Sequence, residues 1–114
     1  MRDFACDLHI HSILSPCGSL DMSPRVIVEK AREARLDIIA VTDHNMTENT
    51  PYVKELGERL GLVVLAGMEL QTQEEIHLIA VFDDYGRARE MQSMIYDLLP
   101  DVPNDAEFWG DQVV

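Results

Sequence analysis

The chain of 114 residues is long enough for one domain with its own core and too short for two. Its apolar share of 46% is ordinary for a globular protein, and no apolar run approaches the roughly 18 residues that a membrane span requires. The formal net charge of −12 repels polyanions over long range, which argues against a protein that grips duplex nucleic acid.

Two features of the sequence bear on where the protein works. Asp3 and Asp7 place carboxylates where a secretory signal would need an unbroken apolar stretch, so we expect no export. Cys6 and Cys17 are too few for a disulfide scaffold, and a reducing compartment would keep both as free thiols. We therefore expect a cytoplasmic protein that does not associate with membranes.

The first predicted element is a strand over residues 4–11, where apolar and polar side chains alternate. Its apolar side, which we expect to pack beneath helices, consists of Phe4, Cys6, Leu8 and Ile10. Its polar side, which would face into a barrel or crevice, consists of Asp7, His9 and His11.

Later segments alternate between helices and strands. Ser23 before Pro24 and Thr50 before Pro51 each indicate a helix N-cap followed by a proline in the first turn. Gly61 lies where the second helix would end in a left-handed residue. Apolar runs indicate strands over 36–41, 62–70 and 76–82. Apolar residues at helical spacing indicate a third helix over 88–98.

The connections between these elements predict the arrangement of the sheet. Helices separate the first three strands, which makes those strands parallel. Residues 71–75 leave room only for a hairpin or a short irregular excursion, so the direction of the fourth strand stays open. The sequence thus predicts an α/β fold with about four strands and three helices.

Metal-competent side chains occur on the strands or at their carboxyl ends, where α/β folds place their active sites. His9 and His11 are two residues apart, so both imidazoles project the same way and can reach one cation at about 2.0–2.1 Å. We expect Asp7 on that same face, where it either binds the cation directly or accepts a hydrogen bond from an imidazole N–H and so fixes its tautomer, and we favour the second role. The alternative for any single histidine is an exposed or satisfied side chain without a metal.

Further candidates come from the later strands. His44 ends the second strand, and Glu69 ends the third, with Gly67 leaving space two residues before it. His77, inside the apolar run 76–82, is a further candidate. The ordinary alternative for Glu69 is a solvated loop acid, and for His77 it is a core histidine bonded to backbone. All four histidines fall on strands or strand ends, so the sequence favours a site with several cations, because every ordinary alternative would have to hold at once.

These residues resemble a known family, the polymerase and histidinol phosphatase (PHP) domain. Four segments carry the resemblance: Asp7-Leu8-His9-Ile10-His11-Ser12, Thr42-Asp43-His44-Asn45, Gly67-Met68-Glu69 and Glu75-Ile76-His77-Leu78. The resemblance implies a distorted seven-stranded (β/α) barrel that holds up to three divalent cations, usually zinc, manganese or iron, and hydrolyses phosphomonoesters or phosphodiesters.

The resemblance also implies roles for single residues. His9 and His11 would hold the first cation, and Glu69 would bridge it to another. His44 would serve the second or third cation, and His77 an outer one. The residues implied to take part in catalysis are therefore His9, His11, His44 and Glu69, and Asp7 and Asp43 would orient the ligands.

The sequence departs from the family pattern at two points. Cys17 lies where many members carry an Asp or His ligand, and it is either a thiolate ligand suited to zinc or a small loop residue before Gly18. The family's later motifs would lie beyond residue 114, and no histidine follows His77. We expect residues 1–114 to be the amino-terminal portion of a PHP domain, whose unfinished sheet either self-associates or pairs with a missing carboxyl-terminal half.

The expected function is metal-dependent hydrolysis of a small phosphorylated substrate, including nucleotides or short oligonucleotides. Nine Lys and Arg against 21 Asp and Glu offer little basic path for a long strand. The alternatives are a catalytically silent metal-binding or assembly module and an inactive fragment of a PHP enzyme.

Overall fold

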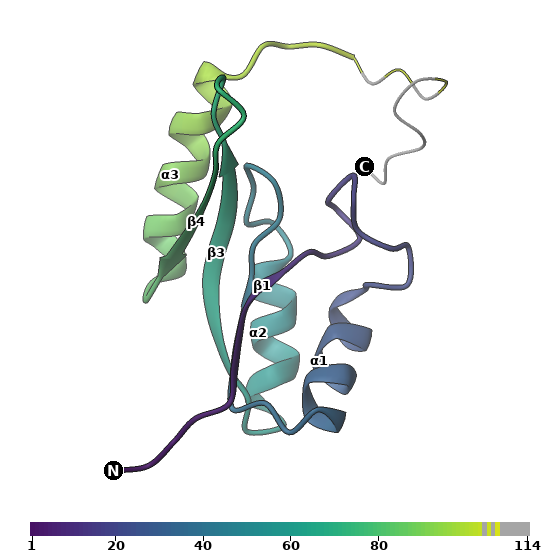
Figure 1. Cartoon of the computed structure of the whole chain (residues 1–114), viewed down its shortest axis with the longest axis vertical. Helices are drawn as coiled ribbons and strands as arrows, with labels where there is room; N and C mark the ends of the chain where they lie inside the picture. Colours follow the sequence, from purple (N-terminus) through teal and green to yellow (C-terminus); the bar gives the residue numbers. More distant parts are fainter. Residues whose placement is uncertain (104, 106, 108–114) are drawn as a thin grey trace.

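The computed structural model describes residues 1–103, 105 and 107, which form one curled sheet with helices packed on it (Figure 1). The elements in chain order are β1 Cys6–Ile10, α1 Pro24–Glu33, β2 Ile38–Val41, α2 Thr50–Glu58, β3 Val63–Gln71, β4 His77–Phe82 and α3 Tyr85–Leu98. Within the described residues the predicted α/β class, with four strands and three helices, is confirmed. No helix in this part of the chain is both long and apolar enough to cross a membrane.

The sheet has the strand order β1-β2-β3-β4. The pairs β1–β2 and β2–β3 are parallel, with α1 and α2 as the crossovers, as the sequence predicts. The pair β3–β4 is antiparallel, which settles the direction that the sequence left open. A short turn suffices there because antiparallel neighbours need no crossover.

One side of the sheet, here called the helical face, carries the core. Ile39 of β2 pairs with Val64 of β3, and both pack with Val53 of α2 in a cluster that also takes side chains from α1. Further along β3, Met68 shares this face and packs with Ala88 of α3. Alternate residues of β3 thus belong to core clusters that include side chains of α1, α2 and α3, so the three helices cover the same side of the sheet.

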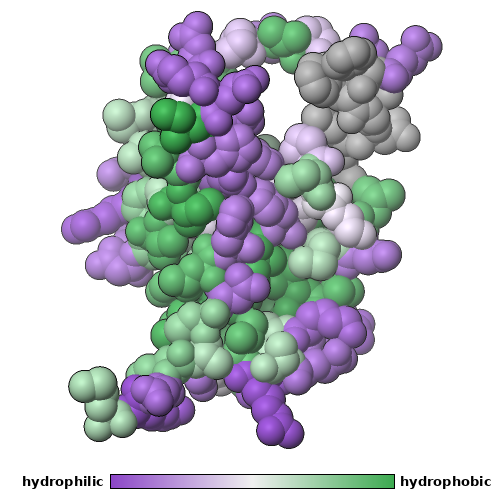
Figure 2. Space-filling view, in the orientation of Figure 1, coloured by the Kyte–Doolittle hydropathy of each residue, from purple (hydrophilic) through white to green (hydrophobic). Residues whose placement is uncertain are grey.

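The opposite side of the sheet, here called the open face, has no helix over it in the described residues. It carries the odd-numbered residues of β3 from Val63 to Gln71 and the residues of β4 that pair with them. Val63, Ile79 and Val81 on this face remain 51%, 40% and 39% exposed. Figure 2 shows hydrophobic surface over the strands in the middle of the view. The open face thus exposes apolar side chains in the part of the chain that the structure describes.

The edge strand β1 differs from the predicted alternation. Asp7 pairs with Ile39 and Ile10 pairs with Val41, with a register shift between the two pairs. Asp7 and Ile10 therefore both lie toward the helical face, although their numbers differ in parity. The prediction that Phe4 and Leu8 pack beneath helices is wrong, since they are 53% and 41% exposed. A shift of this kind rotates the strand, and residues beyond it no longer follow the period of two.

The helix starts agree with the sequence at α1 and differ at α2. The Ser23 hydroxyl accepts a hydrogen bond from the Val26 N–H, as an N-cap does. At α2 the predicted N-cap, Thr50, is already helical, and the cap position is Asn49. The Asn49 side chain does not cap the helix, because its amide instead donates to the Ser12 hydroxyl at 2.8 Å.

Candidate metal centre

Glu69, near the end of β3, lies at the centre of the histidine cluster and is only 3% exposed. Its Oε2 atom is 3.0 Å from His9 Nε2 and 2.8 Å from His11 Nε2. Its Oε1 atom is 2.6 Å from His77 Nδ1. Side chains separated by up to 68 residues in sequence therefore meet at one carboxylate, and the predicted convergence of the imidazoles is confirmed.

His44 reaches the same place because the pairing of β2 with β3 continues past the end of β2. The Glu69 N–H donates to the Asp43 carbonyl at 3.0 Å, and the Asn45 N–H donates to the Glu69 carbonyl at 2.9 Å. These bonds make a parallel bridge between His44 and Glu69. The His44 Nε2 atom lies 3.8 Å from Glu69 Oε2, the most distant of the four imidazole nitrogens that approach the carboxylate.

The position of His77 depends on the antiparallel direction of β4. Gln71 pairs with His77 and Glu69 pairs with Ile79, so His77 is a diagonal neighbour of Glu69 on the open face. Gly67 leaves space beside Glu69, as the sequence predicts. A Cβ atom at position 67 would lie 2.7 Å from the Thr42 Cγ2 atom. Sheet register and a missing side chain together allow the strands to approach closely at the centre.

The surroundings of Glu69 and His44 favour the protonation states in which these side chains bind cations. Burial opposes ionisation of Glu69, but hydrogen bonds from His9 and His77 outweigh it, and the pKa of the carboxyl is lowered. Burial lowers the pKa of His44, and the attraction of Glu69 only partly offsets that effect. A carboxylate and a neutral imidazole are the metal-binding forms of these side chains.

Asp43 acts on the imidazoles through a serine. It is 1% exposed, and its carboxylate accepts from the Ser12 N–H at 2.7 Å and from the Ser15 hydroxyl at 2.6 Å. The Ser15 hydroxyl also lies 3.0 Å from His11 Nδ1. Sequence reasoning predicts Asp43 as an orienting residue but misses Ser12 and Ser15, because a serine in a loop carries no spacing signal.

Asp7 is the predicted site residue that lies apart from the cluster. Its carboxylate accepts from the His9 backbone N–H at 3.2 Å, and its side chain borders a groove between β1 and α1. The prediction that Asp7 shares a face with His9 is wrong, because the register shift in β1 turns the two side chains to opposite sides. The described contacts place no imidazole N–H on its carboxylate.

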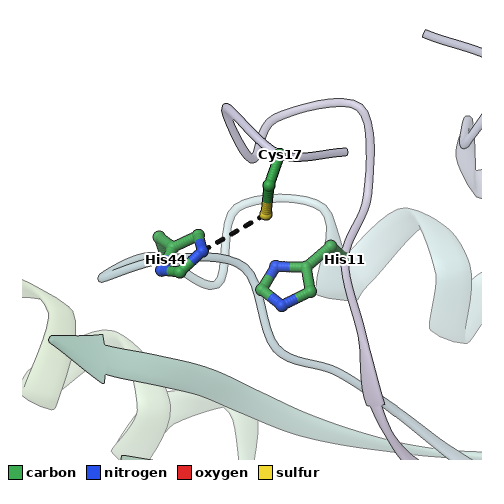
Figure 3. Close-up of side chains that lie close together, drawn as sticks. All are labelled: His11, Cys17 and His44. Atoms are coloured by element: carbon green, nitrogen blue, oxygen red, sulfur yellow. Dashed lines mark hydrogen bonds between the residues drawn. The ribbon is translucent and has the colours of Figure 1, made fainter. Parts of the chain in front are cut away.

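Cys17 approaches the same His44 nitrogen that approaches Glu69. Its Sγ atom is 3.3 Å from His44 Nε2, and the His11 ring lies beside them (Figure 3). Within the described residues, His44 Nδ1 is a buried side-chain nitrogen without a hydrogen-bond partner. The Cys17 thiol therefore lies at the edge of the histidine cluster, next to His44 and His11, and is not grouped with the central Glu69.

The donor atoms fit a site for several divalent cations. Three groups have ligand atoms within 4.8 Å of one another: His9, His11 and Glu69; His44, Glu69 and His77; and His11, Cys17 and His44. Ligand atoms held tetrahedrally about 2.0–2.1 Å from zinc lie about 3.3 Å apart, close to the separations around Glu69. Imidazole, carboxylate and thiol donors together suit zinc and related first-row metals.

Comparison with known proteins agrees with this geometry. The family model of the PHP domain matches residues 7–99, most of the chain. The chain belongs to the PHP domain family. The match includes each of the six candidate ligands, which are His9, His11, Cys17, His44, Glu69 and His77.

Similar sequences occur in longer proteins. The chain is 34% identical over 80 residues to a phosphoribosyl 1,2-cyclic phosphate 1,2-diphosphodiesterase of Eggerthella lenta, which covers 66% of this chain and 29% of that protein. It is 35% identical over 80 residues to the 5′-3′ exoribonuclease Rnm of Salmonella typhimurium, covering 66% and 26%. The chain thus spans less than a third of the length of either relative.

Solved structures share the fold. A protein of Bifidobacterium adolescentis, described as a proposed metal-dependent phosphoesterase, superposes with a TM-score of 0.67 at 29% identity, covering 84% of this chain and 33% of that one. An amidohydrolase of Chromobacterium violaceum superposes with a TM-score of 0.61 at 22% identity, covering 77% and 32%. The second likeness concerns the fold alone.

Proposed function

We propose that this chain supplies the metal-binding half of a PHP-type phosphoesterase that hydrolyses a small phosphorylated substrate. The observation that carries the proposal is the buried Glu69 carboxylate, which lies within 3.0 Å of nitrogens from His9, His11 and His77. A relative named as a phosphodiesterase and another named as an exoribonuclease support phosphoester hydrolysis as the reaction class.

The metals themselves belong to this proposal. Zinc, manganese or iron would be held by His9, His11, His44, Glu69 and His77. When bound, such cations bind phosphate oxygens and lower the pKa of a coordinated water toward neutrality. Glu69 would bridge two positions, since a carboxylate offers two oxygens and each of these oxygens already faces different imidazoles.

The residues of the chain itself hold and orient these ligands. Asp43 fixes Ser15, and Ser15 in turn fixes one nitrogen of His11, which leaves His11 Nε2 directed at Glu69. A ligand whose second nitrogen is hydrogen-bonded keeps one tautomer and one ring orientation. Asp43 and Ser15 are therefore positioning residues in this proposal.

The substrate class follows from charge. The net charge of −12 disfavours duplex nucleic acid, and we propose phosphomonoesters, nucleotides or short oligonucleotides as the substrates. A reducing compartment such as the cytoplasm would keep Cys6 and Cys17 as the free thiols that the fold contains. Specificity would come from loops at the carboxyl ends of the strands.

The test combines metal analysis with turnover. The protein is purified without chelator, its metal content is measured, and hydrolysis of p-nitrophenyl phosphate and bis-(p-nitrophenyl) phosphate is followed with added Mn²⁺ or Zn²⁺. We expect turnover that depends on the cation and is lost in His9→Ala. Protein that contains no metal and cannot be loaded would overturn the proposal.

The second candidate is a catalytically silent metal-binding or assembly module. The observation that favours it is the exposed open face, which leaves one side of the metal centre without neighbouring strands in the described residues. This reading predicts cation binding at the Glu69 cluster with no turnover of either substrate. Activity that rises with bound cation would exclude it.

A further inference from the structure

The histidine cluster contains two kinds of donor in different places. At its centre the partner of the imidazoles is the Glu69 carboxylate, and at its edge the partner is the Cys17 thiol. His44 lies between them, with its Nε2 atom 3.3 Å from Cys17 Sγ and 3.8 Å from Glu69 Oε2. A cation near Cys17 would therefore meet a softer set of ligands than a cation near Glu69.

The loop that carries Cys17 is folded tightly against the end of β1. The Ser15 N–H donates to the Ser12 carbonyl at 3.0 Å, and the Gly18 N–H donates to the Ser15 carbonyl at 2.9 Å. A Cβ atom at position 18 would lie 2.0 Å from the Ser12 carbonyl oxygen, so only glycine permits this approach. Two successive turns and a glycine thus fix where the Cys17 side chain leaves the backbone.

We infer that Cys17 is a thiolate ligand which, with His44 and His11, makes an outer cation position that takes Zn²⁺ in preference to Mn²⁺. The inference rests on the proposed function, because it concerns one part of the same metal centre. Thiolates favour zinc and suit manganese poorly, whereas a carboxylate with imidazoles accommodates both cations. The chain would accordingly select different metals at the two ends of one cluster.

The distances agree with this role. A sulfur about 2.3 Å and a nitrogen about 2.0–2.1 Å from a tetrahedral zinc lie about 3.6 Å apart. The Cys17 Sγ and His44 Nε2 atoms are 3.3 Å apart, so binding requires a shift of only a few tenths of an ångström. The rings of His11 and His44 stack with their centroids 4.7 Å apart, which brings His11 to the same position.

The arrangement also implies competition between cation positions. His11 belongs both to the group around Cys17 and to the group that contains His9 and Glu69. An imidazole nitrogen that binds one cation is not available to a second cation. His44 is likewise shared with Glu69 and His77, so Cys17 is the one ligand that belongs to the outer group alone, and its removal should affect the outer position first.

Cobalt provides a direct test, because Co²⁺ replaces zinc and absorbs light by charge transfer only when a thiolate is bound to it. The metal-free wild-type chain, Cys17→Ser and Cys6→Ser would each be titrated with Co²⁺. Cys6 is the matched control, since it is the other exposed thiol and its sulfur contacts the Phe4 carbonyl at 3.6 Å, away from the cluster. We expect the sulfur-to-cobalt band in wild type and Cys6→Ser, and its loss in Cys17→Ser.

The outcomes separate this inference from the proposed function. A chain that binds Co²⁺ without a sulfur-to-cobalt band, or a band that persists in Cys17→Ser, would overturn the thiolate position and leave the Glu69 cluster intact. A wild-type chain that binds no Co²⁺ at all would overturn both.

Alkylation of the two thiols, followed by mass spectrometry, gives a second readout. Zn²⁺ should protect Cys17 but not Cys6, and Mn²⁺ should protect neither. Equal protection of Cys17 by Mn²⁺ would overturn the selectivity.

Discussion

The two sides of the sheet differ in what their side chains contribute. On the helical face, Ile39 and Met68 are fully buried beneath helices. On the open face, Glu69 is buried by imidazoles, while Ile79 beside it is 40% exposed. Adjacent residues of one strand, Met68 and Glu69, thus belong one to the core and one to the candidate metal centre. The helical face provides the stability that allows the open face to gather polar groups.

The largest expected effect is the loss of a core side chain. Ile39→Ala should lower the free energy of unfolding by about 2–5 kcal/mol, because it leaves a cavity between the sheet and the helices. Ile79→Ala on the open face should change it by less than about 0.5 kcal/mol, since the site is already exposed to solvent. Urea unfolding at low protein concentration, followed by circular dichroism, measures both. Equal losses would mean that the open face is covered as well.

A bound cation should stabilise the chain through the open face. Zn²⁺ at about 100 times its dissociation constant should raise the free energy of unfolding by about 2.7 kcal/mol. Glu69→Gln should remove most of this increment, because the carboxylate is the group that the imidazoles share. The exposed Glu55, paired with Arg59 on α2, provides the control Glu55→Gln. Thermal unfolding with Zn²⁺ and with chelator gives the comparison, and an unchanged increment in Glu69→Gln would contradict it.

The positioning role of Ser15 predicts a smaller effect. Ser15→Ala should weaken cation binding about 10–100-fold, as the loss of a group that orients a metal ligand commonly does. The His11 ring would lose its hydrogen-bonded partner and its fixed orientation. Competition with a chromophoric chelator measures the affinity, and Ser93→Ala on the exposed side of α3 serves as the control. An affinity equal to that of the control would show that Ser15 only closes the loop.

The sequence predicts the elements and the main ligands because both depend on local patterns. His9, His11, His44 and Glu69 follow from a period of two and from strand ends, which the parallel sheet brings to one edge. The sequence does not predict the register shift in β1, because the alternation of side chains along one strand does not specify how that strand pairs with its neighbour. Asp7 is misplaced for this reason.

The contacts around Asp43 are hidden for a different reason. Ser12 and Ser15 approach Asp43 only after the loop before α1 folds against the end of β2. Such contacts depend on tertiary structure, and serines in a loop have no periodicity from which to infer them. The direction of β4, and with it the approach of His77 to Glu69, likewise depends on pairing that a five-residue connection does not specify.

The smallest predicted effect concerns association through the open face. We predict that the isolated chain pairs with a second copy at high concentration, because Val63, Ile79 and Val81 expose apolar surface on the open face and β4 has no strand beyond it in the described residues. Ile79→Asp should weaken this association about tenfold, since a carboxylate would have to be desolvated in the interface.

Tyr52→Asp is the matched control, because Tyr52 is 62% exposed on α2 and away from the open face. Sedimentation velocity over a range of concentrations measures both variants. A wild-type chain that stays monomeric throughout, or equal weakening by the two substitutions, would mean that the open face does not mediate pairing.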